Sequence, residues 1–257
     1  MLYIMGIGLR GAMGLTMEEQ DLLKKPGPVF FETYTSVSPA STLRDLERII
    51  GRDVIPIGRN EVEDGSMLIE LALTEDVFLL ITGDPLSATT HNQLRADARD
   101  AGIEVRIIEN ASIISVIPGK IGLFPYKMGP PVSLPFLYDI FLPRSVCDKI
   151  GVNLKSGLHT ILLLDLREGR TMYSYEAVEA LFKLEEKYSI GTVKPETMIF
   201  SVSKVSQEGE KLIFDTAENI MKMRLEESPA ALVIPSDLNY NEKYFVDKFT
   251  EKCDYFK

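Results

Sequence analysis

The residues of this sequence most able to do chemistry stand directly after a short apolar run. Residues 77–81 are all apolar, too few for an independent helix and well suited to a fully buried strand. Gly83 can adopt backbone angles that other residues resist, and Pro85 pushes Asp84 into an extended conformation. A carboxylate at the carboxyl end of a buried strand lies where open α/β sheets bind their ligands. Asp84 is therefore either part of a ligand site or a cap for the helix that follows.

A second carboxylate occupies the equivalent place in the other half of the chain. Asp165 follows residues 160–164, which also predict a buried strand. Because Asp84 and Asp165 both stand at the carboxyl ends of strands, they could act as a general acid and base pair. Helix capping is the simpler interpretation, and the sequence leaves both open.

The first glycines match the spacing of a dinucleotide-binding fingerprint. Residues 6–11 read GIGLRG, which is G-x-G-x-x-G. Glu32 follows the next expected strand, where such sites place a ribose-binding acid. That fingerprint needs a helix that begins inside the glycine run, so that its N-terminus meets a pyrophosphate. Thr16 and Glu19 instead predict a capping box and a later helix start. An NAD-dependent oxidoreductase stays an alternative, since the glycine spacing matches the fingerprint but the expected helix start does not.

The motifs of several common enzyme classes are absent from the sequence. Two histidines occur, His91 and His159, and no H-E-x-x-H pattern is present. The two cysteines, Cys147 and Cys253, match neither a zinc nor a disulfide spacing. There is no G-x-S-x-G serine elbow and no P-loop. We interpret both histidines as buried or capping groups. Elimination favours a reaction whose donor is already activated, such as methyl transfer from a sulfonium, because alignment and desolvation can supply most of its rate.

The composition excludes some partners and compartments. Asp and Glu number 38 against 28 Lys and Arg, and the net charge of −10 argues against nonspecific nucleic-acid binding, which needs a basic face. No apolar run approaches the roughly 18 residues of a membrane span, and the apolar start lacks the charged beginning of a signal peptide. The widely spaced cysteines fit a reducing compartment. We therefore expect a cytoplasmic protein with no membrane partner.

The apolar runs that must position these residues alternate with helical patterns in the first half. Thr42 with Asp45 predicts a second capped helix, which Gly51 ends. Residues 61–64 are expected as an acidic lead-in to a helix that ends near 74, and another helix is expected from about 89 to 101. This alternation predicts a parallel sheet covered by helices. The expected strands of this half are residues 2–5, 29–31, 54–57, 77–81 and 103–108.

The character of the chain changes where proline and glycine become frequent, between residues 118 and 135. We place the domain boundary there, with one α/β domain at residues 1–117 and another at 118–257. The short, closely spaced strands of the second half suggest hairpins and a mixed sheet. Its expected strands are 132–136, 160–164, 198–202, 211–214 and 231–234, and its expected helices are 144–152, 174–188, one from 216, and 242–253.

Six strings together resemble the diphthine synthases, a family of tetrapyrrole-methylase-like class III methyltransferases. They are IMGIGL (4–9), ETYTS (32–36), GDPLSATTHNQLR (83–95), ENASI (109–113), PYKMG (125–129) and GLHTILLLDL (157–166). The resemblance covers nearly the whole chain. It implies two α/β domains, no Rossmann-type site, and S-adenosyl-L-methionine bound in the cleft between the domains, with S-adenosyl-L-homocysteine as the product. It also implies a homodimer.

The substrate that the resemblance implies is translation elongation factor 2. One of its histidines carries an aminocarboxypropyl group, and methylation of the amino group three times gives diphthine. Eukaryotic members add a methyl ester as well, and because this chain lacks extensions we expect the archaeal type of trimethylation. The nearest alternative is a methyltransferase of the same fold that acts on a tetrapyrrole, a cobalamin or sirohaem precursor. A non-catalytic binding module that keeps the fold is another.

The resemblance assigns donor contacts to particular positions, but no metal and no catalytic residue. Val205 and Ala230 are matched by position only, since residues 203–206 replace an Ala-Arg-Ala-Gly segment of the family. Residues 116–118 also depart from the small-residue helix that is usual there. The positions that match family contacts directly are Leu9, Asp84, Ser87, Ser112, Ile113 and Leu164.

Overall fold

The computed structural model describes residues 1–138, 141–167 and 169–251, and the chain divides into two compact units. The first unit is Met1–Ile113 and the second is Ile114–Lys257. The boundary that the sequence suggests, between 117 and 118, lies inside a helix, α6 (Ile113–Lys120). Pro118 lies within α6, where it removes one backbone donor, and the helical hydrogen bonds continue after it. Ile121 N donates to Ile117 O at 3.1 Å, and Leu123 N donates to Pro118 O at 2.8 Å.

The first unit is built on a parallel sheet, as the alternation of apolar runs predicts. Its strands lie in the order β3-β2-β4-β1-β5, and every described pair is parallel. Both β1 and β4 are buried along their whole length, which explains why their sequences are apolar throughout. The strands are β1 (Leu2–Gly6), β2 (Val29–Glu32), β3 (Ile55–Ile57), β4 (Val77–Ile81) and β5 (Val105–Ile108).

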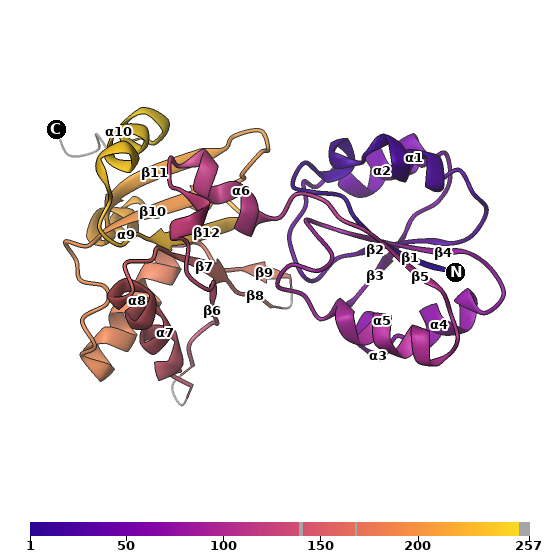
Figure 1. Ribbon diagram of the computed structural model, residues 1–257, viewed down its shortest axis with the longest axis horizontal. Coiled ribbons are helices and arrows are strands. Elements are labelled where there is room, and N and C mark those ends of the chain that lie inside the picture. The colour runs from indigo at the N-terminus through magenta and orange to yellow at the C-terminus, as the bar shows by residue number, and fades with distance from the viewer. Residues whose placement is uncertain (139–140, 168, 252–257) are drawn as a thin grey trace. The chain divides into compact units, whose positions relative to one another are not determined.

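Helices cover both faces of this sheet (Figure 1). Successive side chains of a strand point to opposite faces, so Tyr3 and Met5 join one hydrophobic cluster and Leu2 and Ile4 the other. On the first face lie α1 (Met17–Leu22) and α2 (Thr42–Ile50). On the second face lie α3 (Arg59–Asp64), α4 (Ser66–Ala72) and α5 (His91–Asp100).

Two of the predicted helix ends are confirmed. Thr16 and Glu19 form the expected capping box: Glu19 N donates to Thr16 Oγ1 at 3.2 Å, and Thr16 N donates to Glu19 Oε2 at 2.7 Å. Gly51 ends α2 in the left-handed conformation at φ 76°. This conformation strains residues that carry a Cβ, and glycine adopts it without that penalty.

Two other helix predictions for this unit are wrong. Thr42 is not a cap, because it is already the first helical residue, and Asp45 pairs with Arg48 at 3.1 Å. The acidic stretch expected only as a lead-in belongs to a helix of its own, α3, which Gly65 at φ 67° divides from the expected helix, α4. A Cβ on Gly65 would lie 2.8 Å from Leu94 Cδ1, so the break lets α5 pack closely.

The second unit has the mixed sheet that its short strands suggest. The strand order is β11-β10-β12-β7-β6, in which β6 and β7 are parallel and the other neighbours antiparallel. A separate small ribbon, β8 (Leu166–Arg167) with β9 (Arg170–Thr171), was not predicted. The sheet consists of β6 (Val132–Leu134), β7 (Thr160–Leu164), β10 (Met198–Ser203), β11 (Lys211–Thr216) and β12 (Ala230–Ile234).

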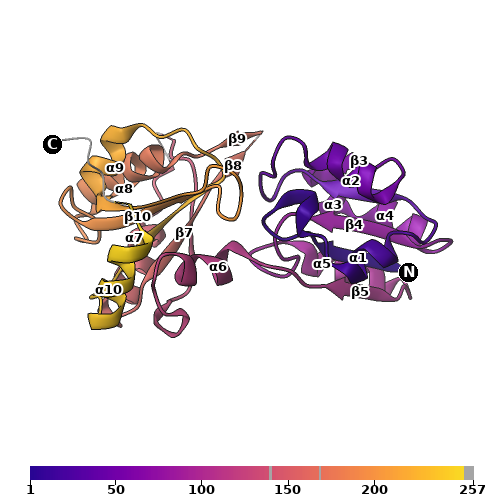
Figure 2. The same ribbon diagram turned by 90° about the horizontal axis from the view of Figure 1, so that it is seen from above.

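One large hydrophobic cluster joins this sheet to α7 (Arg144–Lys155), α8 (Ser174–Tyr188) and α9 (Ala217–Met223). The amphipathic helix α8 has the predicted bounds, because its apolar face recurs with the helical period. Figure 2 shows α8 and α9 on one side of the sheet and α10 (Tyr240–Phe249) on the other. Within the described ranges, no helix combines the length and apolar character needed to cross a membrane.

Candidate functional site

Asp84 organises the turn that follows β4. Its Oδ1 atom accepts hydrogen bonds from Leu86 N at 3.0 Å and Ser87 Oγ at 2.8 Å. Its Oδ2 atom accepts from Asn110 N at 3.2 Å, beyond the end of β5. Because α5 begins only at His91, Asp84 is not a helix cap. The carboxylate instead shapes the Gly83–Ser87 turn and ties it to the neighbouring loop.

The glycine run joins the loops after β1 and β4. Gly8 N donates to Gly83 O at 3.1 Å, and Gly83 N donates to Gly8 O at 2.8 Å. A Cβ on Gly6 would lie 2.5 Å from Gly83 O, and one on Gly8 would lie 2.7 Å from Asn110 Oδ1. The glycines therefore allow three loops to meet, which explains their spacing without a pyrophosphate. The dinucleotide alternative also fails at the helix, since a 3-10 turn, η1 (Gly11–Gly14), precedes α1.

Asn110 is the site residue that sequence reasoning missed. Its Nδ2 atom donates to Gly6 O at 2.7 Å and to Gly14 O at 3.1 Å, and its Oδ1 atom accepts from Ala111 N at 2.8 Å. It therefore fixes the loop after β5 against the loop after β1. The ENASI string contains it, but a single asparagine in a loop has no spacing that distinguishes this role from an ordinary turn.

Replacing Asn110 with alanine is expected to destabilise the first unit by about 1–3 kcal/mol. The change removes the Nδ2 hydrogen bonds to Gly6 O and Gly14 O and the longer one to Glu19 Oε2, and leaves the two carbonyl groups without that donor. Amide hydrogen exchange of β1 and β5 measures the effect. Asn92→Ala, a change at an exposed position of α5, is the matched control and should alter protection little. Equal protection in the two variants would contradict the proposed role of Asn110.

The predicted residues of the first unit gather at the carboxyl edge of its sheet. Leu9 comes directly after the Gly8–Gly83 bridge and is partly exposed. Asp84 and Ser87 share the turn after β4, and Ser112 follows β5 and is 8% exposed. Parallel strands place their carboxyl ends at one edge, so the topology brings these side chains to a common region. Ile113 stands at the start of α6, at the end of this unit.

The predicted residues of the second unit also share one end of their sheet. Leu164 is the last residue of β7, and Ala230 is the first residue of the neighbouring β12. Ala230 pairs with Ser203 at the end of β10, and the buried Val205 follows shortly after. Lys204 and Ser206, on either side of Val205, have left-handed φ angles of 49° and 63°. The sheet register therefore groups these residues, and donor binding by them remains a prediction.

Asp165 and His159 have structural contacts. The Asp165 Oδ2 atom accepts a hydrogen bond from Phe136 N at 2.9 Å. His159 is fully buried, and its Nδ1 atom accepts from Ser236 N at 3.0 Å, so the ring proton lies on Nε2, which is 3.0 Å from Glu242 Oε1. Burial lowers the pKa of His159. This confirms the interpretation of His159 as a buried, hydrogen-bonded group.

Glu242 is also fully buried and is held ionised by its neighbours. Burial by itself raises the pKa of this carboxyl group. The Lys127 ammonium at 2.7 Å, the Asn239 N–H at 3.0 Å and the His159 ring together outweigh it and bring the pKa to about 2. This cluster links the start of α10 to β7 and to the 3-10 turn η2 (Pro125–Lys127).

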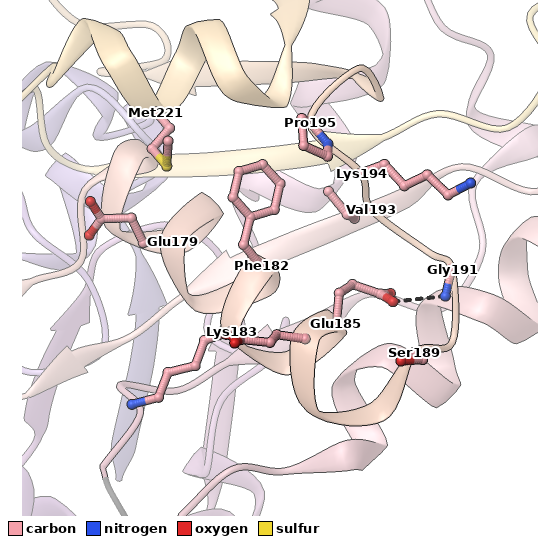
Figure 3. A pocket seen from close by; sticks show the side chains of 11 residues that line it. Glu179, Phe182, Lys183, Glu185, Ser189, Gly191, Val193, Lys194, Pro195 and Met221 are labelled. Carbon is pink, nitrogen blue, oxygen red and sulfur yellow. Dashed lines mark hydrogen bonds between the residues drawn. The ribbon is translucent and has the colours of Figure 1, made fainter.

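A cavity of about 870 Å³ opens between the end of α8, the following loop and α9 (Figure 3). Its most interior carboxylate, Glu185, accepts hydrogen bonds from Gly191 N at 2.8 Å and Thr192 N at 2.7 Å. Glu185 therefore holds the loop instead of facing a ligand, and none of the predicted site residues lines this cavity. In the described parts of the chain, no cluster of three or more His, Cys, Asp or Glu side chains could hold a metal ion.

Comparisons with known proteins agree on one family. A family model described as Tetrapyrrole (Corrin/Porphyrin) Methylases matches residues 1–221. A diphthine synthase of Thermoplasma acidophilum is 40% identical over 251 residues, which cover 98% of this chain and 96% of that protein. A diphthine methyl ester synthase of Saccharomyces cerevisiae is 33% identical over 91% of this chain and 84% of its own length. A crystal structure of diphthine synthase is 25% identical, with a TM-score of 0.88 over 98% of this chain and 97% of that one.

These similarities extend over both units, so they do not reflect one shared motif. They confirm the fold class expected from the sequence, two α/β units of tetrapyrrole-methylase type, and the enzyme class, a methyltransferase. The chain therefore belongs to the tetrapyrrole (corrin/porphyrin) methylase family and, within it, to the diphthine synthases.

Proposed function

We propose that this protein transfers methyl groups from S-adenosyl-L-methionine to the amino group of the modified histidine of translation elongation factor 2, three times, to give diphthine. The observation that carries the proposal is the 40% identity to a diphthine synthase across 98% of the chain. The family model by itself is broader, since its description names corrin and porphyrin methylases. The full-length relatives favour the protein substrate over a tetrapyrrole.

The residues at the carboxyl edge of the first sheet fit a donor of this kind. The Gly83–Ser87 turn begins with a left-handed glycine, φ 84°, and a glycine lets the backbone approach a ligand closely. Leu9 adds an apolar, partly exposed side chain. A sulfonium donor has both apolar and hydrogen-bonding parts, and pockets for such molecules are mostly apolar with a few fixed polar groups. In the second unit, Leu164, Val205 and Ala230 are the proposed contacts.

The donor supplies a methyl group that is already activated on a sulfonium sulfur. The work left to the protein is then to hold donor and acceptor amine in line and to exclude water. Both oxygens of Asp84 accept hydrogen bonds within the protein. Its contribution is therefore to shape the turn that holds the donor. The acceptor amine must lose one proton for each methyl group it gains. We assign no side chain as its base.

The partners follow from the same proposal. Elongation factor 2 is the protein substrate, and the enzyme acts as a cytoplasmic homodimer. The yeast relative is named a diphthine methyl ester synthase, which raises the question of a fourth methyl group. The close similarity to the Thermoplasma protein, named a diphthine synthase, supports three.

Labelled donor distinguishes the proposal from its alternatives. We expect label to pass to aminocarboxypropylated elongation factor 2 and not to a cobalamin or sirohaem precursor. Binding of S-adenosyl-L-homocysteine without binding of NAD, measured by calorimetry, separates methyl transfer from the oxidoreductase alternative. Label on a tetrapyrrole, or binding of donor with no transfer to either substrate, would contradict the proposed function.

A further inference from the structure

The loops after β2 and β4 meet over a buried pair of titratable side chains that the proposed reaction does not use. Glu32 is the last residue of β2 and is 2% exposed, and His91 begins α5 and is 1% exposed. The distance from His91 Nε2 to Glu32 Oε2 is 2.8 Å. Neither atom has another hydrogen-bond partner among the described residues. An ionisable group this deeply buried is unfavourable without a partner, so the two depend on each other.

The other nitrogen of His91 faces the Gly83–Ser87 turn. His91 Nδ1 lies 3.2 Å from Pro85 O, and the same carbonyl accepts Thr89 Oγ1 at 2.7 Å. A carbonyl can only accept a hydrogen bond, so Nδ1 must carry a proton to bond it. Both ring nitrogens of His91 therefore face oxygen atoms. A neutral imidazole with its one proton on Nδ1 satisfies the Pro85 carbonyl, and the Nε2–Oε2 contact then needs a second proton on one of its two atoms.

Glu32 fixes the loop on its own side with its other oxygen. Its Oε1 atom accepts hydrogen bonds from Tyr34 N at 3.3 Å, from Thr35 N at 2.5 Å and from the Thr35 hydroxyl group. A second link joins the same two loops, where Ser38 Oγ lies 2.5 Å from Thr82 Oγ1. The ETYTS loop is therefore a support for the turn after β4, and Glu32 is its anchor. The sequence suggested an ordinary loop or a ribose-binding acid there.

The backbone directly after the turn is strained. Ala88 has a φ of 56°, which costs on the order of 1 kcal/mol for a residue with a Cβ. Asp84 bonds the turn to the loop after β5. His91 bonds the Pro85 carbonyl of the turn and also contacts Glu32 at the end of β2. The turn is thus bonded from both sides.

We propose that Glu32 and His91 are positioning residues, which share one buried proton and thereby hold the Pro85 carbonyl so that the Gly83–Ser87 turn is preformed for the methyl donor. The inference rests on the proposed function, because it takes this turn as part of the donor site. It adds a role for two residues that the donor itself does not have to touch. The shared proton makes the pair neutral overall, which allows it to stay buried.

The proposal predicts a particular pattern of donor affinities. His91→Ala removes the bond to Pro85 and should weaken binding of S-adenosyl-L-homocysteine about tenfold or more, the loss expected for one anchoring hydrogen bond. Glu32→Leu should do the same, since it leaves Nε2 unpaired. Glu32→Gln should retain most of the affinity, because its amide can accept from the Thr35 N–H and donate to Nε2 while Nδ1 keeps its proton. Calorimetry measures all three.

Nitrogen NMR tests the predicted protonation of the His91 ring directly. The chain has two histidines, so ¹⁵N-labelled histidine gives four ring nitrogen signals, an Nδ1 and an Nε2 for each ring. His91 should carry its proton on Nδ1, and His159 on Nε2, because His159 Nδ1 accepts from Ser236 N. In Glu32→Gln, His91 should be neutral with the proton still on Nδ1. A wild-type His91 with no proton on Nδ1 would overturn the proposal, even if none of the variants folds.

The remaining outcomes separate this proposal from the proposed function. Glu63→Gln is the matched control, because Glu63 also pairs with a base, Arg59 at 3.3 Å, but is exposed; its donor affinity should equal that of the wild type. Wild-type protein that binds no donor overturns the proposed function, and this inference with it. Normal wild-type binding with unchanged affinity in folded His91→Ala and Glu32→Leu overturns this inference alone. Equal losses of affinity in Glu32→Gln and Glu32→Leu would also overturn this inference, because the glutamine amide should retain most of the affinity.

Discussion

Replacing Asp84 with alanine is expected to weaken binding of S-adenosyl-L-homocysteine about 100-fold, or about 2.7 kcal/mol. The change removes three hydrogen bonds to one carboxylate, from Leu86 N, Ser87 Oγ and Asn110 N. Hydrogen bonds to a charged group contribute about 1.5–3 kcal/mol each, and part of that loss should appear as a disordered turn. Calorimetry of S-adenosyl-L-homocysteine binding measures the effect. Turnover should fall in proportion to donor occupancy.

Two variants make this prediction specific. Asp84→Asn keeps an acceptor oxygen but places an amide opposite a backbone donor, so its loss should be intermediate, about tenfold. Asp97→Ala removes a carboxylate on α5 that accepts one bond from Gln93 at 2.7 Å, and should bind donor normally. Unchanged donor affinity together with a collapse of turnover in Asp84→Ala would contradict the role given to Asp84, because it would indicate a proton-transfer function.

Replacing Glu242 with glutamine is expected to destabilise the second unit by about 2–4 kcal/mol. The change leaves the Lys127 ammonium without its buried carboxylate, and removing one partner of a buried pair is costly. Hydrogen exchange of β7 and α10 is the suitable measurement, since the chain has no tryptophan and its two units need not unfold together. The control, Glu218→Gln, breaks an exposed pair with Lys222 and should cost less than about 0.5 kcal/mol.

The second unit is also expected to lose stability in acid, because of His159 and Glu242. Both pKa shifts are downward, so the unfolded chain binds more protons than the folded one as the pH falls. The contribution of His159 is complete above its ordinary pKa of 6.5 and is lost as the pH falls below that value. The contribution of Glu242 is complete above 4.5 and is lost as the pH approaches 2. Protection of β7 that stays constant from pH 7 to pH 4 would contradict this account.

Sequence periodicity predicted most elements of the fold, because hydrophobic burial leaves a regular pattern. The strand β4 and the helix α8 have the expected bounds, and the parallel and mixed sheets follow from the order and spacing of the strands. The failures occur where a tertiary contact decides the conformation. Gly65 separates α3 from α4 at the point where Leu94 of α5 packs too closely for a Cβ.

The candidate site was predictable only in part. The place of Asp84 at a strand end follows from an apolar run and a proline, both of which are local signals. Asp84 also bonds to Asn110, 26 residues away, and His91 pairs with Glu32 at the end of β2, and no local pattern records such distant pairs. For the same reason the glycine run suggested a pyrophosphate site, whereas its glycines allow the loops after β1, β4 and β5 to meet.

Mass spectrometry of elongation factor 2 tests the central claim most directly. Purified, aminocarboxypropylated elongation factor 2 is incubated with this protein and S-adenosyl-L-methionine. The mass of the peptide that carries the modified histidine is then measured. We expect a gain of three methyl groups, all on the amino nitrogen, and none when the donor is omitted. A fourth methyl group would identify the ester-forming reaction and contradict the trimethylation proposed here. No gain, from protein that binds the donor, would contradict the assignment of the substrate.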